Sequence, residues 1–264
     1  MNGDKIPQKQ SRETWMPLPF VAPDNLKNKI LFALRLFLDF QVATVYPDVK
    51  KTLRKSSGDI LEIGCGAQPY RHLIPQGVNY YACDTKDSER FSYKKIDGVI
   101  SYDGRSFPFP ESKFNMVFHT HVLEHVYDCS FFLSECYRVL RSGGRMFFAI
   151  PFAARYHYIP DDYWRFTPAC LEKLLMSAGF TNIDIVPKGS DVVVAVAKMN
   201  AIFQRMIFKN YSFFLWRITT RLFFVVLFAL PVLFLTVLGH LCLLMKWGSS
   251  DDPLGYSVYC ERKV

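Results

Sequence analysis

The sequence predicts an α/β fold in which a mostly parallel sheet alternates with helices. Short apolar runs of strand length recur between helical segments from about residue 59 to residue 186. The first of these runs, Asp59–Ile63, breaks into the glycine turn Gly64-Cys65-Gly66. Strands that alternate with helices pair in parallel through right-handed crossovers. Because ligands of such sheets bind at the carboxyl ends of the strands, we expect the functional residues there.

Composition sets limits on the class of protein. The 264 residues suffice for one sizeable domain and an appendage, and the hydrophobic residues, 50% of the chain, are concentrated late. The net charge of +8 suits an anionic membrane surface or a nucleic acid. Seven cysteines without C-x-x-C spacing predict free thiols in a reducing compartment rather than disulfides or a zinc site. The polar first ten residues predict no secretory signal peptide.

The region before the first strand is predicted to be an arm and one helix. Residues 1–23 carry four prolines and are expected to be extended. Asp24 is suited to cap a helix that runs to about Tyr46. Its apolar face is broad, which leaves two interpretations open, a helix covering the domain or an interfacial membrane helix. Lys50–Ser57 is expected to be a basic linker.

The remaining elements of the sheet follow in order. Strands are predicted at Val78–Cys83, near Ile96–Ser101, and at Phe114–His119, Met146–Ile150 and Asn182–Val186. Helices are predicted to begin at Pro69, to run over Cys129–Leu140 until closed by Gly143-Gly144, and to extend from the cap Thr167 to Gly179.

The first two strands end in residues suited to a nucleotide. Gly64 and Gly66 carry no side chain that would keep a ligand from the backbone, and the N-terminus of a following helix would present free N–H groups. Asp84 ends the second strand, 22 residues after Glu62. This is close to the roughly 20 residues that separate a glycine turn from a ribose-binding acid in nucleotide-binding units.

Five segments together carry a family resemblance. They are Glu62-Ile-Gly-Cys-Gly66, Asp84, Asp103 with Phe107-Pro-Phe, Val122-Leu-Glu-His125, and Arg138-Val-Leu-Arg-Ser-Gly-Gly144. In order and spacing they resemble the small-molecule, type 11-like branch of class I S-adenosylmethionine-dependent methyltransferases over roughly residues 58–180. The resemblance implies a Rossmann-like sheet of seven strands with the last one antiparallel.

The resemblance also implies a cofactor site for S-adenosyl-L-methionine. Gly64 and Gly66 would approach its methionine part, Asp84 its ribose hydroxyls and Asp103 its adenine, while Phe118–His121 would line the methionine end. The predicted cofactor-binding residues are Glu62, Gly64, Cys65, Gly66, Asp84, Asp103, Gly104, His119 and Thr120. As a candidate base, however, His119 is expected to point into the packing of the domain. The chain departs from the family pattern at the third glycine, where Gln68 and Pro69 stand.

Residues near the fifth strand are candidates for the acceptor site. Methyl transfer from a sulfonium depends on alignment, and a general base is needed only for a hydroxyl or a protonated amine. His121 and His157 are the predicted catalytic residues. The segment 155–167 is expected to form an acceptor-binding lid through Asp161, Tyr163, Trp164 and Arg165. A structural Trp/Arg corner is the alternative for the last two of these. His125 is expected to bond near a helix start, and no metal ligands are predicted.

A long apolar insertion precedes the last strand, which is predicted at Tyr256–Arg262. Leu222–Met245 is uncharged over 24 residues, enough to cross a bilayer. A single crossing would separate the last strand from its sheet, so we expect a helical hairpin that turns near Pro231. Interfacial anchors on one side are expected from Lys209, Arg217, Arg221, Lys246 and Trp247. A hydrophobic subdomain or dimer interface is the alternative.

These observations predict four segments and a function. The segments are 1–57 (arm and covering helix), 58–187 (methyltransferase core), 188–253 (insertion) and 254–264 (final strand). The predicted function is methyl transfer to a lipid-linked or membrane-proximal small molecule at the cytoplasmic face of a membrane. Three alternatives stay open. They are a cytoplasmic methyltransferase of a soluble metabolite that oligomerises through the insertion, a nucleic-acid methyltransferase, which the scattered basic residues disfavour, and a non-catalytic cofactor binder.

Overall fold

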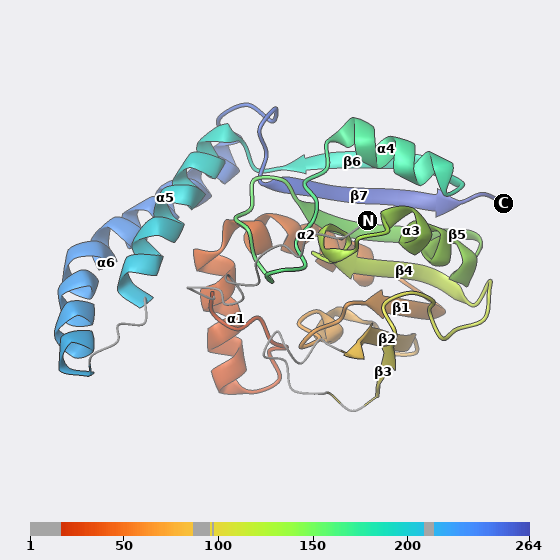
Figure 1. Cartoon of the computed structure of the whole chain (residues 1–264), viewed down its shortest axis with the longest axis horizontal. Helices are drawn as coiled ribbons and strands as arrows, with labels where there is room; N and C mark the ends of the chain where they lie inside the picture. The colour runs from red at the N-terminus through yellow and green to blue at the C-terminus, as the bar shows by residue number, and fades with distance from the viewer. Residues whose placement is uncertain (1–16, 87–95, 97, 209–213) are drawn as a thin grey trace, which may run out of the picture.

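A seven-stranded sheet forms the centre of the molecule (Figure 1). The computed structural model describes residues 17–86, 96, 98–208 and 214–264. The strand order is β3-β2-β1-β4-β5-β7-β6. The strands are β1 (Asp59–Ile63), β2 (Asn79–Thr85), β3 (Val99–Tyr102), β4 (Phe114–Thr120), β5 (Leu140–Pro151), β6 (Phe180–Lys188) and β7 (Gly255–Arg262).

The pairing confirms the predicted sheet. β1 to β5 pair in parallel, and β7 lies between β5 and β6, antiparallel to both. The central strands read as continuous apolar runs because helices cover both faces. One face packs against α3 (Cys129–Val139) and α4 (Pro168–Ser177), and the other packs against α2 (Phe40–Leu53).

Two core elements differ from their predicted form. The glycine pair at 143–144 lies within β5, which begins at Leu140. α3 ends at Val139 because the next residue, Leu140, already pairs with Phe114 of β4. The register between β4 and β5 then shifts before Met116. The short helix after the glycine turn is a 3₁₀ turn, Arg71–Leu73. Thr167 caps α4 as predicted, since its side chain accepts a hydrogen bond from Cys170 N–H.

The N-terminal region forms two helices, and the prediction of a single helix ending near Tyr46 is wrong. α1 (Leu26–Leu38) and α2 are bent by 111° at Asp39. Asp39 adopts an extended conformation, and its carboxylate accepts from the N–H groups of Gln41 and Val42, which makes it a helix cap. Asn25 rather than Asp24 caps α1. The first half of the predicted basic linker belongs to α2, which continues to Leu53.

The insertion is a helical hairpin, but it does not turn at Pro231. Its arms are α5 (Asp191–Phe208) and α6 (Phe214–Met245), and residues 209–213 between them, with Lys209, lie outside the described residues. Pro231 lies inside α6. A proline inside a helix costs about 3 kcal/mol, and packing against α5 offsets that loss. Asn200 donates to Thr236 Oγ1 at 2.9 Å across the buried interface between the antiparallel arms.

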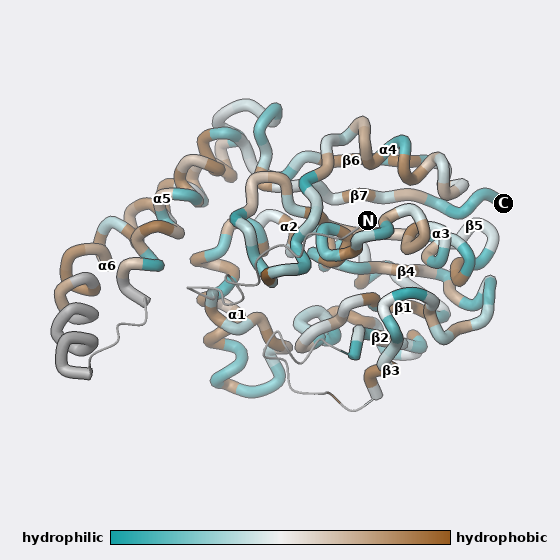
Figure 2. The backbone as a smooth tube through the Cα atoms, in the orientation of Figure 1, coloured by the Kyte–Doolittle hydropathy of each residue, from teal (hydrophilic) through white to brown (hydrophobic). Residues whose placement is uncertain are grey.

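The hairpin extends away from the sheet (Figure 1), and the coloured part of α6 is mostly hydrophobic (Figure 2). One face of α6 is apolar and exposed. That face comprises Val226, Leu230, Leu233, Phe234, Val237, Leu241 and Leu244. Val225–Met245 is long and apolar enough to cross a membrane, and 28% of it is buried. The predicted anchors lie at opposite ends of α6, with Arg217 and Arg221 near its start and Lys246 and Trp247 after its end. A common side for these anchors therefore stays a prediction, and it requires α6 to lie along the membrane surface.

Candidate active site

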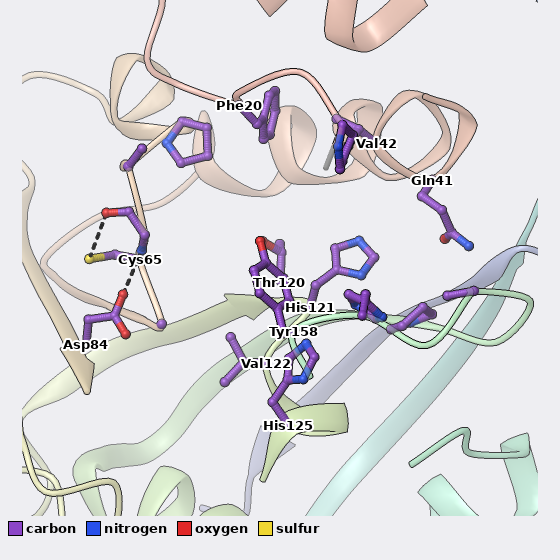
Figure 3. Close-up of a pocket in the computed structure, with 18 of the residues that line it drawn as sticks. Phe20, Gln41, Val42, Cys65, Asp84, Thr120, His121, Val122, His125 and Tyr158 are labelled. Carbon is purple, nitrogen blue, oxygen red and sulfur yellow. Dashed lines mark hydrogen bonds between the residues drawn. The ribbon is translucent and has the colours of Figure 1, made fainter. Parts of the chain in front are cut away.

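A cleft of about 2750 Å³ opens at the carboxyl ends of β1, β2 and β4. Small-molecule sites commonly occupy about 300–1000 Å³, so this cleft has room for a cofactor and a second molecule. The glycine turn and Asp84 lie at one end, and residues of α5 line the other. Figure 3 shows Phe20, Val42 and Gln41 facing Thr120, His121 and His125 across it.

The glycine turn requires its glycines. Gly64 has φ +63° and Gly66 φ +48°, the left-handed region that glycine enters most easily. A Cβ atom on Gly64 would lie 2.5 Å from Val122 Cγ2. Gln68, near the position of the missing third glycine, also has a positive φ of 50°. Its buried Nε2 lacks a hydrogen-bond partner, and the residue lines the cleft. The turn therefore keeps its shape without the third glycine.

Asp84 is fixed at the end of β2. One carboxylate oxygen accepts from Gly66 N–H at 2.9 Å and the other from Thr85 N–H at 2.8 Å. Burial raises the pKa of Asp84, and these two hydrogen bonds oppose the shift. Asp103 and Gly104 also line the cleft, where the Asp103 carboxylate accepts from Arg105 N–H at 2.8 Å.

Glu62 is a buried acid in the cleft wall. Burial raises its pKa to about 8, although the Tyr80 hydroxyl, which donates to the carboxylate, acts to lower it. Glu62 and Asp84 thus place two acids beside a glycine turn whose backbone a ligand can approach. The Asp84 carboxylate beside this turn fits a cofactor that carries a pair of hydroxyls, as S-adenosyl-L-methionine does. Cys65, also predicted for the site, is buried in the same wall.

Two of the three site residues predicted at the end of β4 line the cleft, and the third does not. Thr120 and His121 line the cleft. His121 adopts φ +54°, and its N–H donates to the Ala149 carbonyl at 2.9 Å. His119 is instead fully buried and stacks on Phe148 with ring centroids 4.8 Å apart. Its predicted cofactor contact is therefore wrong, because strand alternation turns it into the core.

Some residues of the predicted lid line the cleft and others do not. His157, Asp161 and Tyr163 line the cleft, whereas Trp164 and Arg165 do not. The Trp164 indole donates to the Val126 carbonyl at 3.0 Å. The Arg165 guanidinium donates to both Asp162 oxygens, at 2.7 and 2.8 Å. These contacts favour the structural corner that was the alternative interpretation, and the predicted contact of the two residues with the acceptor stays untested.

The sequence analysis missed a cluster around Glu124. Its side chain is fully buried, and neither carboxylate oxygen has a hydrogen-bond partner. The nearest nitrogens to Oε1 are His121 Nδ1 at 3.5 Å, His125 Nε2 at 3.7 Å and His157 Nε2 at 3.9 Å. Burial acts to raise the pKa of Glu124, and the three imidazoles hold it below its usual value. The spacing His-x-x-Glu-His over 121–125 was the available signal.

Two other walls of the cleft were also missed. Residues 17–42 contribute Phe20, Gln41 and Val42, although the sequence predicted only a covering or interfacial helix there. α5 contributes Lys198 and Arg205, among others. No local sequence motif marks either group of residues, because each lines the cleft only through the packing of its segment against elements distant in the sequence.

Comparisons with known proteins agree with this geometry. Residues 61–148 match the family model described as a methyltransferase domain. Over 104 residues the chain is 32% identical to a "probable S-adenosylmethionine-dependent methyltransferase" of Mycolicibacterium smegmatis, covering 37% of this chain and 40% of that protein. A similarly named Mycobacterium tuberculosis protein is 29% identical over 103 residues, 37% of each chain. Residues 61–148 therefore belong to a methyltransferase domain. The resemblance stated from the sequence, and the cofactor with it, are confirmed.

A solved structure shows the same fold over most of the chain. It is a "SAM dependent methyltransferase" from Archaeoglobus fulgidus, which superposes with a TM-score of 0.51 at 16% identity and covers 89% of this chain and 99% of that one. The alignments with the curated relatives span only about two fifths of those proteins. The activity and substrate of the whole chain are therefore addressed as proposals.

We predict that Asp84→Ala weakens the binding of S-adenosyl-L-methionine about 10- to 100-fold, because buried ligand hydroxyls would lose a charged acceptor worth about 1.5–3 kcal/mol. Isothermal titration calorimetry measures this loss. Asp103→Ala is the matched control, with a smaller loss expected because Asp103 is exposed. Unchanged affinity in Asp84→Ala would show that this carboxylate does not contact the ligand.

Glu62 predicts a pH dependence of stability. Its folded pKa of about 8 lies above the ordinary value of 4.5, so the folded protein holds this proton more tightly than the unfolded chain does. The resulting stabilisation is complete below pH 4.5 and is lost as the pH rises towards 8, by up to about 1.4 kcal/mol per pH unit. Thermal unfolding from pH 5 to 9 should show the parent losing stability relative to Glu62→Gln, which cannot ionise. Parallel curves for the two proteins would contradict the raised pKa.

Proposed function

We propose that this protein transfers the methyl group of S-adenosyl-L-methionine to a small, lipid-linked or otherwise membrane-proximal acceptor. One observation carries the proposal. The cleft that begins at the glycine turn and Asp84 continues without a break to α5, one arm of the apolar hairpin. An acceptor at the α5 end would lie beside the surface that is most suited to a bilayer.

The residues of the cleft have separate tasks in this reaction. S-adenosyl-L-methionine supplies a methyl group on a sulfonium, and in-line displacement requires alignment of the acceptor above all. The glycine turn and Asp84 would hold the cofactor, and Asp161 and Tyr163 would contact the acceptor. For a hydroxyl or protonated amine, His121 or His157 would accept the proton, since both imidazoles line the cleft.

The α5 wall favours an anionic group on the acceptor. Lys198 and Arg205 both line the cleft there. Desolvation lowers the pKa of the Lys198 ammonium, and the charge of Arg165 acts in the same direction. A phosphate or carboxylate bound between Lys198 and Arg205 would compensate both effects. Lipid-linked small molecules commonly carry such a group next to the chain, so this charge supports the proposed acceptor class.

The hairpin supports a monotopic association with the cytoplasmic face of a membrane. β7 follows α6 and pairs with β5 and β6, so the chain leaves the sheet and returns to it on the same side. The exposed face of α6 would then contact the lipid, with cationic residues near both ends of the helix. The same face is also the observation behind a second candidate, a methyltransferase of a soluble metabolite that dimerises through α6.

A labelling experiment tests the function. The purified protein is incubated with methyl-labelled cofactor and either a lipid extract or an aqueous metabolite extract, and products are identified by mass spectrometry. We expect label in the lipid extract with the parent and its loss with Asp84→Ala. Label only in the aqueous extract would favour the second candidate. No label in either extract, despite cofactor binding, would indicate a non-catalytic binder.

We predict that membrane association resists high salt and yields to detergent. Burial of a dozen large apolar side chains at about 1.5–3 kcal/mol each exceeds any surface electrostatic contribution. Association through charge alone would be removed at about 1 M salt, where screening acts within about 3 Å. Leu230→Asp combined with Phe234→Asp should release the protein in a flotation assay. Met176→Asp, on an exposed apolar residue of α4, should not. A soluble dimer would contradict membrane contact.

A further inference from the structure

The cluster around Glu124 contains a buried charge with incomplete compensation. Glu124 has no exposed surface, and standard hydrogen-bond geometry gives neither of its oxygens a partner. A buried carboxylate normally requires hydrogen bonds, a counter-charge or a metal ion, because desolvation of an isolated charge is expensive. The backbone carbonyl of Glu124 is engaged by the N–H groups of Tyr163 and Trp164, which fixes the residue in place. The side chain is therefore held where a cation would satisfy it.

Two imidazoles are oriented towards that carboxylate by hydrogen bonds on their far sides. His125 Nδ1 lies 2.6 Å from the Asp161 carbonyl, and His157 Nδ1 lies 2.9 Å from the Arg155 carbonyl and 3.1 Å from an Asp162 oxygen. The carbonyl and carboxylate oxygens only accept, so each Nδ1 carries a proton, while Arg165 Nη2 also lies 3.5 Å from His157 Nδ1. Each ring turns its Nε2 towards Glu124, and His125 Nε2 has no hydrogen-bond partner among the described residues. Histidines that bind metals are commonly oriented in this way.

The distances suit a shared ion. Glu124 Oε1 lies 3.7 Å from His125 Nε2 and 3.9 Å from His157 Nε2. One ligand atom from each of the three residues can be chosen so that all lie within 4.8 Å of one another. Ligands at about 2.0–2.2 Å from a tetrahedral metal are about 3.3–3.6 Å apart. To share one coordination sphere, the two Glu124 distances would have to shorten by a few tenths of an ångström and the distance between the two histidine ligand atoms by up to about 1.5 Å.

We propose that Glu124, His125 and His157 bind one divalent transition-metal ion in the wall of the active-site cleft. Two imidazoles and one carboxylate favour an ion such as Zn²⁺, Co²⁺ or Fe²⁺ over Mg²⁺ or Ca²⁺, which prefer oxygen ligands. Both histidines line the cleft and Glu124 lies behind them, so the remaining coordination positions face the cleft. His121, with Nδ1 3.5 Å from Glu124 Oε1, is adjacent to the site.

A metal ion at this site would restrict the chemical class of the acceptor. This consequence rests on the proposed function. A hydroxyl oxygen bound at an open position would lose its proton more readily, because the ion stabilises the alkoxide or phenolate. The acceptor class would then be a hydroxyl compound methylated on oxygen. His157, as a ligand, would no longer be available as a base, which leaves His121 to accept the proton.

Binding of Co²⁺ tests the metal site without cofactor or acceptor, so its outcome is independent of the proposed function. The full-length protein, purified without a polyhistidine tag and treated with chelator, is titrated with Co²⁺ while the visible absorption of the ion is followed. We expect one equivalent to bind and Zn²⁺ to displace it. Glu124→Gln and His157→Gln should each lower the Co²⁺ affinity about 100-fold or more, and His72→Gln, outside the cluster, should not.

Calorimetry with S-adenosyl-L-methionine shows whether each variant remains folded, and His125→Gln replaces any variant that does not. Absence of Co²⁺ binding to the parent would overturn the proposal. Equal affinity in the parent and in a folded Glu124→Gln or His125→Gln variant would also overturn it.

Discussion

The rest of the structure depends on the position of β7 between β5 and β6. The chain leaves the sheet at the end of β6 and returns as β7, which lies between β5 and β6. The residues between β6 and β7 therefore form a closed excursion, an insertion whose two ends meet at the sheet. Leu254 closes it. Its N–H donates to the Lys188 carbonyl at 2.8 Å, and its own carbonyl accepts from Phe152, Ala153 and the Gln41 side chain. One residue therefore joins both ends of the hairpin to β5 and to α2, which sets α5 against the cleft.

The elements that could be predicted from the sequence are those whose environment is set locally. Strands β1 and β4 are buried on both faces, so each reads as an unbroken apolar run, and the turn at Gly64 needs a backbone conformation that few residues adopt. The break at Asp39 was missed because the apolar pattern continues through it. The turn expected at Pro231 was wrong because the proline indicates only that the helix is locally less stable. The contacts with α5 that offset this loss come from residues about 30 positions away, which the local sequence does not show.

The residues of the candidate site that could be predicted are likewise those whose position is set locally. Glu62, Gly64 and Asp84 follow from their places at strand ends, and the structure puts all three in the cleft wall. Trp164 has the chemistry of a binding residue, yet its partner, the Val126 carbonyl, lies 38 positions away and makes it structural. Glu124 and His157 come together only when the loop after β5 folds back over β4, so no spacing in the sequence could have paired them.

The closed excursion also has a consequence for the order in which the chain is made. α6 precedes β7 in the sequence, so a ribosome completes the apolar helix before it supplies the strand that joins the hairpin to the sheet. During that interval β5 has one unpaired edge and β6 has no strand partner, and pairings between residues more than 100 positions apart, such as Met146 with Cys260, form slowly. The nascent protein therefore presents its most apolar helix and unpaired strand edges at once, so it most needs a chaperone or a bilayer in the interval before β7 is made.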